Sequence, residues 1–234
     1  MTDSYSRYLL RCRVVPRIGY LAARAQFEAA FREHGLPDAI RTDNGEPFAG
    51  VGLMGLSRLA VWWIRLGIAH QRIEPGKPQQ NGSHERMHGT LKRQTASPPA
   101  RTLRAQQLRF DDFVREYNQE RPHEGLPQMA TPASAYAASA RAYPERLAEV
   151  EYPAGYERRY VDDSGKFAWD GVKVFLGKAL GEQVVGLSPV GEEPRPGPGR
   201  PRYWAVRFGP AELGVLDEHL RRLLRPRERR HLGL

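Results

Sequence analysis

The sequence is short of cysteine and of long apolar runs. Cys12 is the only cysteine in 234 residues, so no disulfide can form within the chain, and its apolar surroundings predict a buried thiol. No apolar run approaches the roughly 20 residues that a membrane-spanning helix needs. Residues 1–7 are polar and do not resemble a signal peptide. We therefore expect a soluble cytoplasmic protein with no membrane partner.

Acidic residues are also in deficit. Lys and Arg number 36 against 27 Asp and Glu, which gives a formal net charge of +9. Such a surplus favours a polyanionic partner, because each phosphate contact releases counterions and adds affinity that does not depend on sequence. The alternative is a basic surface that only keeps the protein soluble.

The first half of the chain has the pattern of an α/β fold. The expected elements are a strand at 8–15, a helix at 20–34, a strand at 39–43, a helix at 59–66 with Ser57 as its N-cap, an extended segment at 68–73, a helix from about Gly82 that ends before Pro98, and a helix that ends before Pro122. Strand, helix and strand in this order indicate a crossover unit. Trp62 and Trp63 are expected in the core.

The second half has a different texture. Residues 127–154 are rich in Ala, Pro, Ser and Tyr and predict a linker, with a short helix at 133–142. Short β-prone runs follow at 156–161, 167–169, 172–176, 184–187, 203–208 and 213–216. With hairpin turns at Asp163-Ser164-Gly165 and Asp170-Gly171, they predict a small all-β barrel-like domain at 155–217.

The C-terminal residues 218–234 form an arginine-rich tail in this interpretation. Six arginines lie between 221 and 230, against Glu228 alone. A solvated tail and a non-specific phosphate contact are both open. Residues 191–201 are rich in Pro and Gly and predict a loop.

Two carboxylates stand out. Asp43 follows a predicted strand and precedes Asn44-Gly45, so it is either a functional acid at a strand end or an ordinary turn residue. Glu85 is the one acid on a basic helix, where a first-turn acid would also be favoured by the helix dipole.

The same helix contains a zinc-protease pattern. His84-Glu85-Arg86-Met87-His88 fits H-E-x-x-H, in which two histidines share a helix face and the Glu is a general base. The context argues against a zinc peptidase, because no carboxylate lies between His88 and Asp111 to complete the ligand set. It is kept as a remote alternative.

Five motifs in order resemble one family. They are Thr42-Asp43-Asn44-Gly45-x-Pro47-Phe48, Trp62-Trp63-Ile64-Arg65-Leu66-Gly67-Ile68, Pro75-Gly76-Lys77-Pro78-Gln79-Gln80-Asn81-Gly82, His84-Glu85-Arg86-Met87-His88-x-Thr90-Leu91-Lys92 and Tyr117-Asn118-x-x-Arg121-Pro122-His123. Together they resemble the integrase catalytic core of DDE transposases from insertion-sequence elements of the IS481 and IS3 type. The C-terminal β segment also resembles the tail that follows this core.

The resemblance implies an RNase H-like fold and metal-dependent cleavage and joining of DNA strands. In such cores three carboxylates hold two Mg²⁺ (or Mn²⁺) ions, and Asp43 matches the second acid and Glu85 the third. The spacing between them is longer than in retroviral-type cores, which predicts an extra loop at 49–55. The implied partners are the element ends, the target DNA, and further copies or a full-length transposase, in a bacterial cytoplasm at the nucleoid.

The first acid has no counterpart. In the family it lies upstream of the segment that residues 2–8 match, and Asp3 corresponds to a non-catalytic position. We therefore expect residues 1–126 to be an N-terminally truncated core without its first strand, with weak or no activity. A non-catalytic DNA-binding remnant or regulator of transposition is the alternative.

Basic residues beside Glu85 are the candidate DNA contacts. Lys92 comes about two helical turns after Glu85, so the two side chains should share a face, with Arg86 and Arg93 beside them. A solvated helix face is the alternative. His123 is expected to pack at a helix end.

Overall fold

The computed structural model describes most of the chain. The residues outside the description are 18, 51–54, 75, 78–81 and 191–201. The predicted loop at 191–201 lies outside the described residues. So do residues 51–54 of the predicted loop at 49–55, and residues 75 and 78–81 of the motif that ends at Gly82. Among the described residues, no helix is long and apolar enough to cross a membrane.

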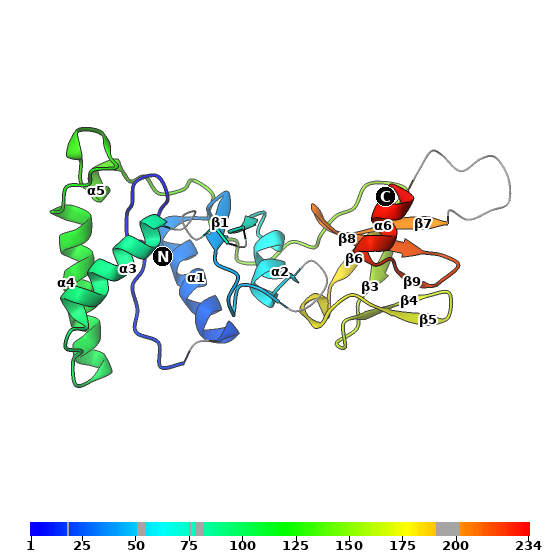
Figure 1. Ribbon diagram of the computed structural model, residues 1–234, viewed down its shortest axis with the longest axis horizontal. Coiled ribbons are helices and arrows are strands. Elements are labelled where there is room, and N and C mark those ends of the chain that lie inside the picture. Colours follow the sequence, from blue (N-terminus) through cyan, green and yellow to red (C-terminus); the bar gives the residue numbers. More distant parts are fainter. Residues whose placement is uncertain (18, 51–54, 75, 78–81, 191–201) are drawn as a thin grey trace. The chain divides into compact units, whose positions relative to one another are not determined.

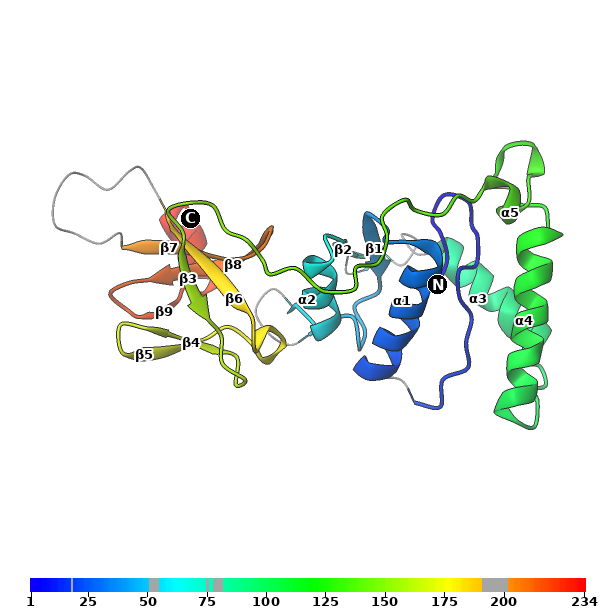
Figure 2. The same cartoon turned by 180° about the vertical axis from the view of Figure 1, so that it is seen from behind.

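Two compact units divide the described chain (Figures 1 and 2). The first contains residues 1–44 and 71–145, and the second contains 45–70 and 146–234. These limits cut the chain at other points than the predicted 1–126, 127–154, 155–217 and 218–234. That domain assignment remains a prediction.

The elements between residues 20 and 135 are mixed α and β. In order they are α1 (Tyr20–His34), β1 (Ala39–Thr42), α2 (Arg58–Arg65), β2 (Ala69–Arg72), α3 (Gly82–Thr95), α4 (Leu103–Gln119), the 3-10 turn η3 (Pro127–Met129) and α5 (Pro132–Ala135). β1 and β2 form a two-stranded sheet. The predicted helices at 20–34 and 59–66 and the strand at 39–43 are confirmed.

Local side-chain chemistry explains where two of these helices begin. The Ser57 hydroxyl accepts a hydrogen bond from the Ala60 backbone N–H at 3.2 Å, so the predicted N-cap of α2 is confirmed. Thr102 caps α4 in the same way, at 3.1 Å from the Ala105 nitrogen. Gly67 follows α2 with a φ of 67°, a left-handed conformation that glycine adopts without strain.

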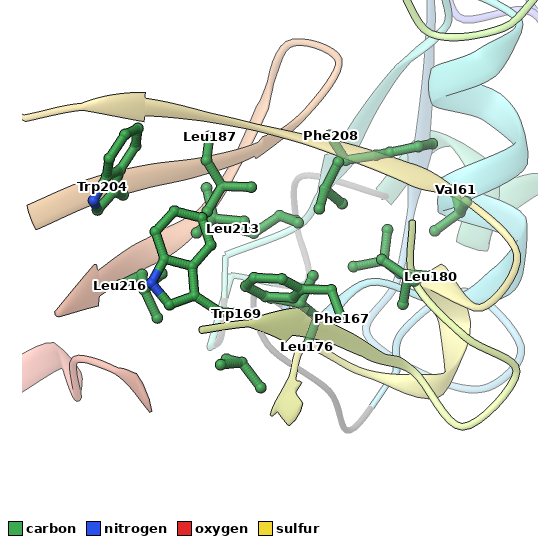
Figure 3. Close-up of a cluster of buried hydrophobic side chains, with 14 residues drawn as sticks. Val61, Phe167, Trp169, Leu176, Leu180, Leu187, Trp204, Phe208, Leu213 and Leu216 are labelled. Atoms are coloured by element: carbon green, nitrogen blue, oxygen red, sulfur yellow. The ribbon is translucent and has the colours of Figure 1, made fainter. Parts of the chain in front are cut away.

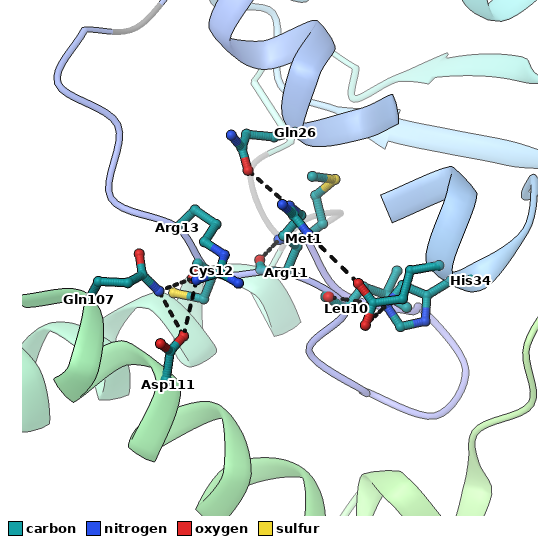
Figure 4. A network of polar contacts seen from close by, with 10 residues as sticks. Met1, Leu10, Arg11, Cys12, Arg13, Gln26, His34, Gln107 and Asp111 are labelled. Atoms are coloured by element: carbon teal, nitrogen blue, oxygen red, sulfur yellow. Dashed lines mark hydrogen bonds and ion pairs between the residues drawn. The ribbon is translucent and has the colours of Figure 1, made fainter. Parts of the chain in front are cut away.

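The predicted strand at 8–15 is wrong. In this segment the structure has only an isolated bridge between Thr2 and Leu9. Side chains of α4 take the place of a strand partner: Asn118 bonds both the N–H and the carbonyl of Leu9, at 2.8 and 3.2 Å. Gln107 bonds the Cys12 carbonyl (Figure 4). It also accepts a hydrogen bond from the Val14 N–H. The predicted crossover unit therefore lacks its first strand among the described residues.

Cys12 lies beside this contact and is half-buried rather than fully buried. Burial raises the pKa of its thiol, and the nearby Asp111 carboxylate also raises it, although more weakly. The thiol is thus held in its neutral form.

The predicted helix at 133–142 is also wrong beyond its first turn, because α5 ends at Ala135. The chain that follows pairs with the end of α1 instead. Ser139 donates its N–H to the His34 carbonyl at 2.9 Å, and Leu36 donates its N–H to the Arg141 carbonyl at 2.7 Å. In a helix over 133–142 the Ser139 N–H would instead bond the carbonyl of Ala135, four residues earlier.

An apolar cluster joins the N-terminal segment to α3 and α4, which lie side by side in both views. Its buried members are Leu9, Met87, Phe113 and Tyr117. Burying side chains of this size contributes about 1.5–3 kcal/mol each. The cluster fixes which face of α3 points inward.

The second half is built mainly of antiparallel strands. They are β3 (Glu157–Tyr160), β4 (Lys166–Trp169), β5 (Val172–Phe175), β6 (Val184–Pro189), β7 (Tyr203–Phe208), β8 (Ala211–Asp217) and β9 (Arg222–Leu223), with the 3-10 turn η4 (Lys178–Leu180) between β5 and β6. One sheet has the order β3-β6-β7-β8-β9, and β4 pairs with β5. All six predicted β runs are confirmed, whereas the barrel-like form remains a prediction.

Aromatic and branched side chains fill the core of the second unit (Figure 3). Trp169 and Trp204 meet edge to face, with ring centroids 5.2 Å apart, and Phe167 contacts Trp169 in the same way. Val61 of α2 packs in this cluster. Trp62 and Trp63 are also buried, so their predicted place in a core is confirmed.

The arginine-rich C-terminus is folded over part of its length. After β9, helix α6 (Pro226–Leu232) begins with proline, and Glu228 accepts a hydrogen bond from the Arg225 N–H at 2.7 Å. The same carboxylate pairs with Arg222 at 2.7 Å, and Arg229 pairs with Glu212. Of the two alternatives for this tail, the fully solvated one does not agree with these contacts, and a phosphate contact stays a prediction.

Two hairpin glycines offer a matched test of the second unit. Gly165 and Gly171 have nearly equal φ values, 82° and 78°, but a Cβ at Gly165 would lie 2.4 Å from the Gly177 backbone, whereas nothing lies within 4 Å at Gly171. We expect Gly171→Ala to lower the free energy of unfolding by about 1–2 kcal/mol through φ alone. Gly165→Ala should cost about 1–3 kcal/mol more through overlap.

Chemical denaturation followed by tryptophan fluorescence measures both changes. Equal losses for the two variants would contradict the close approach at Gly165.

Candidate functional site

Asp43 lies directly after β1 and is exposed. The loop that carries it is fixed to the segment after β2: the Ile73 N–H donates to the Thr42 carbonyl at 3.1 Å, and Asn44 Nδ2 donates to the Ile73 carbonyl at 2.9 Å. The predicted location of Asp43 at a strand end is confirmed, and its role remains a prediction.

Glu85 lies in the first turn of α3 and is exposed. At about 100° per residue, Glu85 and Lys92 share one face of the helix, and Arg86 and Arg93 share the neighbouring face. Met87 is buried on the opposite side. All four charged side chains are exposed, so α3 presents one acid and three bases on its outer side.

The start of α3 contacts the N-terminal segment and is influenced by the charge of Asp43. His84 Nδ1 lies 3.1 Å from the Thr2 hydroxyl, and the ring is half-buried. Burial, and then the charges of His88 and of the Met1 amine, lower the pKa of His84 to about 4, while the Asp43 carboxylate acts in the opposite sense. Asp43 is thus within electrostatic range of the residue beside Glu85.

The His84 and His88 rings lie 4.4 Å apart between centroids, as the H-E-x-x-H spacing predicts. Burial also lowers the pKa of His88. Nevertheless, the part of the chain that the structure describes contains no group of three or more His, Cys, Asp or Glu side chains that could hold a metal ion. The histidine pair therefore has no third protein ligand among the described residues, and the zinc peptidase alternative stays untested.

Mg²⁺ requires different ligands from zinc. Mg²⁺ prefers oxygen ligands and is often held by one or two carboxylates together with waters and substrate phosphates. Asp43 and Glu85 supply exposed carboxylate oxygens of this kind. The donor set suits a divalent ion that shares its coordination with a phosphate ligand.

Sequence reasoning assigned no role to Arg7 or Arg121. Arg121 stands in the Tyr117–His123 motif, whose residues carried the resemblance but suggested no chemistry. The structure places both arginines around the Tyr117–His123 pair. Sequence spacing could not bring Arg7 to this point.

Comparison with known proteins adds a family match. Residues 66–132 match the integrase core domain. This segment includes Glu85 and all three predicted DNA-contacting bases of α3, whereas Asp43 precedes it.

Two relatives come from insertion elements. An uncharacterized 39.2 kDa protein of insertion element IS476 from Xanthomonas euvesicatoria is 36% identical over 115 residues, which cover 48% of this chain and 30% of the relative. An uncharacterized 31.7 kDa protein of insertion element IS407 from Burkholderia multivorans is 32% identical over 125 residues, 53% of this chain and 42% of the relative. The chain thus spans less than half the length of either relative.

Among solved structures, one chain of a simian T-cell lymphotropic virus intasome in complex with the PP2A regulatory subunit B56 gamma has a TM-score of 0.45 to this chain. The two are 20% identical, and the alignment covers 82% of this chain and 65% of the other.

The nearness of Asp43 to α3 can be tested by titration. The folded chain keeps His84 neutral, so the pKa of His84 is lower in the folded chain than its ordinary value of 6.5. The contribution of His84 to folding stability is therefore complete above pH 6.5 and is lost as the pH falls toward 4. We expect Asp43→Asn to lower the His84 pKa further, since it removes the charge that raises it. NMR of the histidine side chains in metal-free buffer measures the shift.

Asp38→Asn is the control, because Asp38 is an exposed acid paired with Arg141. An unchanged His84 pKa in Asp43→Asn would show that Asp43 is not close to α3.

Proposed function

We propose that this chain is part of a DDE transposase of an insertion element, which cleaves and joins DNA strands by metal-dependent phosphoryl transfer. The observation that carries the proposal is the integrase core match at residues 66–132, together with the exposed carboxylates of Asp43 and Glu85. The similarity to insertion-element proteins supports it. The RNase H-like fold and the IS481 or IS3 type belong to the same proposal.

Asp43 and Glu85 are the proposed metal ligands. Integrase cores of the DDE type use divalent metals, and Mg²⁺ or Mn²⁺ would be held by these carboxylates and by DNA phosphate oxygens. When bound, the ion supplies Lewis-acid stabilisation of charge on the phosphoryl oxygens. The protein itself would hold the two carboxylates in place: Asp43 through the loop after β1, and Glu85 through the buried face of α3.

DNA is the proposed partner, as element ends and as target. On α3, Lys92 would hold the backbone beside Glu85, and Arg86 and Arg93 would extend the basic surface. Arg93 is steadied by a 3.3 Å hydrogen bond from its Nη2 to the Thr90 hydroxyl. Further copies of the chain or a full-length transposase are the proposed protein partners.

A second candidate is a DNA-binding regulator without catalysis. Two observations favour it: the net charge of +9, and the lack of a third candidate ligand near Asp43 and Glu85 among the described residues. Such a protein would bind DNA through α3 but leave the strands intact.

Cleavage or joining of DNA strands distinguishes the two candidate functions. With the ends of its own element and Mg²⁺ or Mn²⁺, we expect at most weak cleavage or joining, and a further fall of at least about 100-fold in Asp43→Asn and Glu85→Gln, because each removes a charge that stabilises the transition state through the metal. Gel analysis of labelled DNA measures the rate. Calorimetric titration with Mn²⁺ should show weaker binding in both variants.

Asp112→Asn is the control, since Asp112 is an exposed α4 acid that pairs with Arg115. If the unmodified chain binds DNA but never cuts it, the transposase activity is refuted for this chain and the regulator is supported.

The α3 surface predicts a salt effect. We expect Lys92→Ala to weaken binding to duplex DNA and to reduce the slope of log K against log salt by about 1, the loss of one phosphate contact. Fluorescence anisotropy at several salt concentrations measures the slope. Arg32→Ala should leave it unchanged, because Arg32 already pairs with Glu28 at 2.8 Å. An unaltered slope in Lys92→Ala would exclude this contact.

A further inference from the structure

His123 is held rigidly at the end of α4. Its Nε2 lies 2.8 Å from the Tyr117 hydroxyl, and the two rings meet edge to face with centroids 5.2 Å apart. Its backbone N–H donates to the Ala130 carbonyl at 3.1 Å, and its carbonyl accepts from the Leu126 N–H at 3.0 Å. Ring and backbone are therefore both fixed in position.

Arg7 reaches the same loop from the N-terminal segment. It is half-buried, and its Nη1 donates to the Ser4 carbonyl at 2.7 Å. A Cβ added at Gly125 would lie 3.8 Å from Arg7 Nε and 3.9 Å from Nη2, so the guanidinium packs on the chain just beyond His123. A residue near the start of the sequence thus meets the end of α4.

Positive charge gathers around this pair of rings. The charges of Arg7, Arg121 and Arg86 all lower the pKa of His123, although burial is the largest cause. Arg121 and Arg7 likewise lower the pKa of Tyr117, against the larger effect of burial. Three guanidinium groups from three parts of the chain therefore act on one site.

Nearby carboxylates offset only part of this charge. Glu116 approaches Arg121 at 3.8 Å, a long contact with the acid half exposed, and Glu124 acts on His123 in the opposite sense to the arginines. Like charges repel more strongly where side chains are half-buried, because water screens them less. An anion between the guanidinium groups would relieve that repulsion.

We propose that Arg7, Arg121 and His123 bind a backbone phosphate of DNA, next to Arg86 on α3. The guanidinium fork matches two phosphate oxygens, which favours this ligand. In the tautomer in which the Tyr117 hydroxyl donates to Nε2, His123 Nδ1–H is left to donate to a phosphate oxygen. The inference rests on the proposed function, since it extends the DNA path from α3 to the end of α4.

Duplex DNA of mixed sequence is the probe, with anisotropy measured over a range of salt. We expect Arg7→Ala and Arg121→Ala each to weaken binding roughly tenfold and to reduce the salt slope by about 1. Arg121→Lys should keep most of the slope, because a point charge remains. Arg115→Ala on α4 is the control, since Arg115 is exposed and pairs with Asp112 at 3.0 Å.

A variant that is expected to strengthen DNA binding serves as a control for misfolding. Glu124 is exposed, so Glu124→Gln should leave the fold intact and strengthen DNA binding about two- to threefold, because it removes a negative charge beside the phosphate. Unchanged slopes in Arg7→Ala and Arg121→Ala, with no gain in Glu124→Gln, would overturn the site.

Two further results are also decisive. If Lys92→Ala reduces the slope but the Arg7 and Arg121 variants alter only self-association, this site is refuted in favour of a contact between copies of the chain, and the proposed function survives. If the unmodified chain does not bind DNA at all, both proposals fail together.

Discussion

The side chain of Asn118 makes the contact on which the first unit depends. It is buried, and its amide bonds both polar groups of the Leu9 backbone. Gln107 repeats the arrangement for Cys12 and Val14 further along α4. A buried backbone group left unpaired costs about 1–3 kcal/mol. Two neutral amides therefore pair the backbone of a segment that joins no sheet in the described part of the chain.

The geometry of the candidate site depends on the contact between Asn118 and Leu9. Asn118 holds the backbone of Leu9 in place. The Leu9 side chain then packs with Met87 in the apolar cluster, and this packing sets the rotation of α3 about its axis. Thr2, at the start of the same segment, meets His84. The outer face of α3 then carries Glu85 among its bases, close to the loop of β1. Packing on one side of the helix thus determines the charge presented on the other.

Arginine is used differently in the two units. Near the C-terminus, Arg222 pairs with Glu228, and Arg229 pairs with Glu212. Exposed pairs of this kind add little stability, but they neutralise charge and help α6 to begin. Around His123 in the first unit, the guanidinium groups of Arg7 and Arg121 gather with weaker compensation.

The sequence by itself determined the features whose causes are local. Helical periodicity and the Ser57 cap predicted α2, and alternating β runs with Asp170-Gly171 predicted the strands of the second unit, where both turn residues have positive φ. It also gave Asp43 its place at a strand end and Glu85 its place in a first turn. Tertiary structure alone decided the state of residues 8–15, because their backbone partners lie about a hundred residues away on α4. It also decided that Asp43 lies near His84 and that Arg7 meets the end of α4, since these neighbours are set by packing between distant segments.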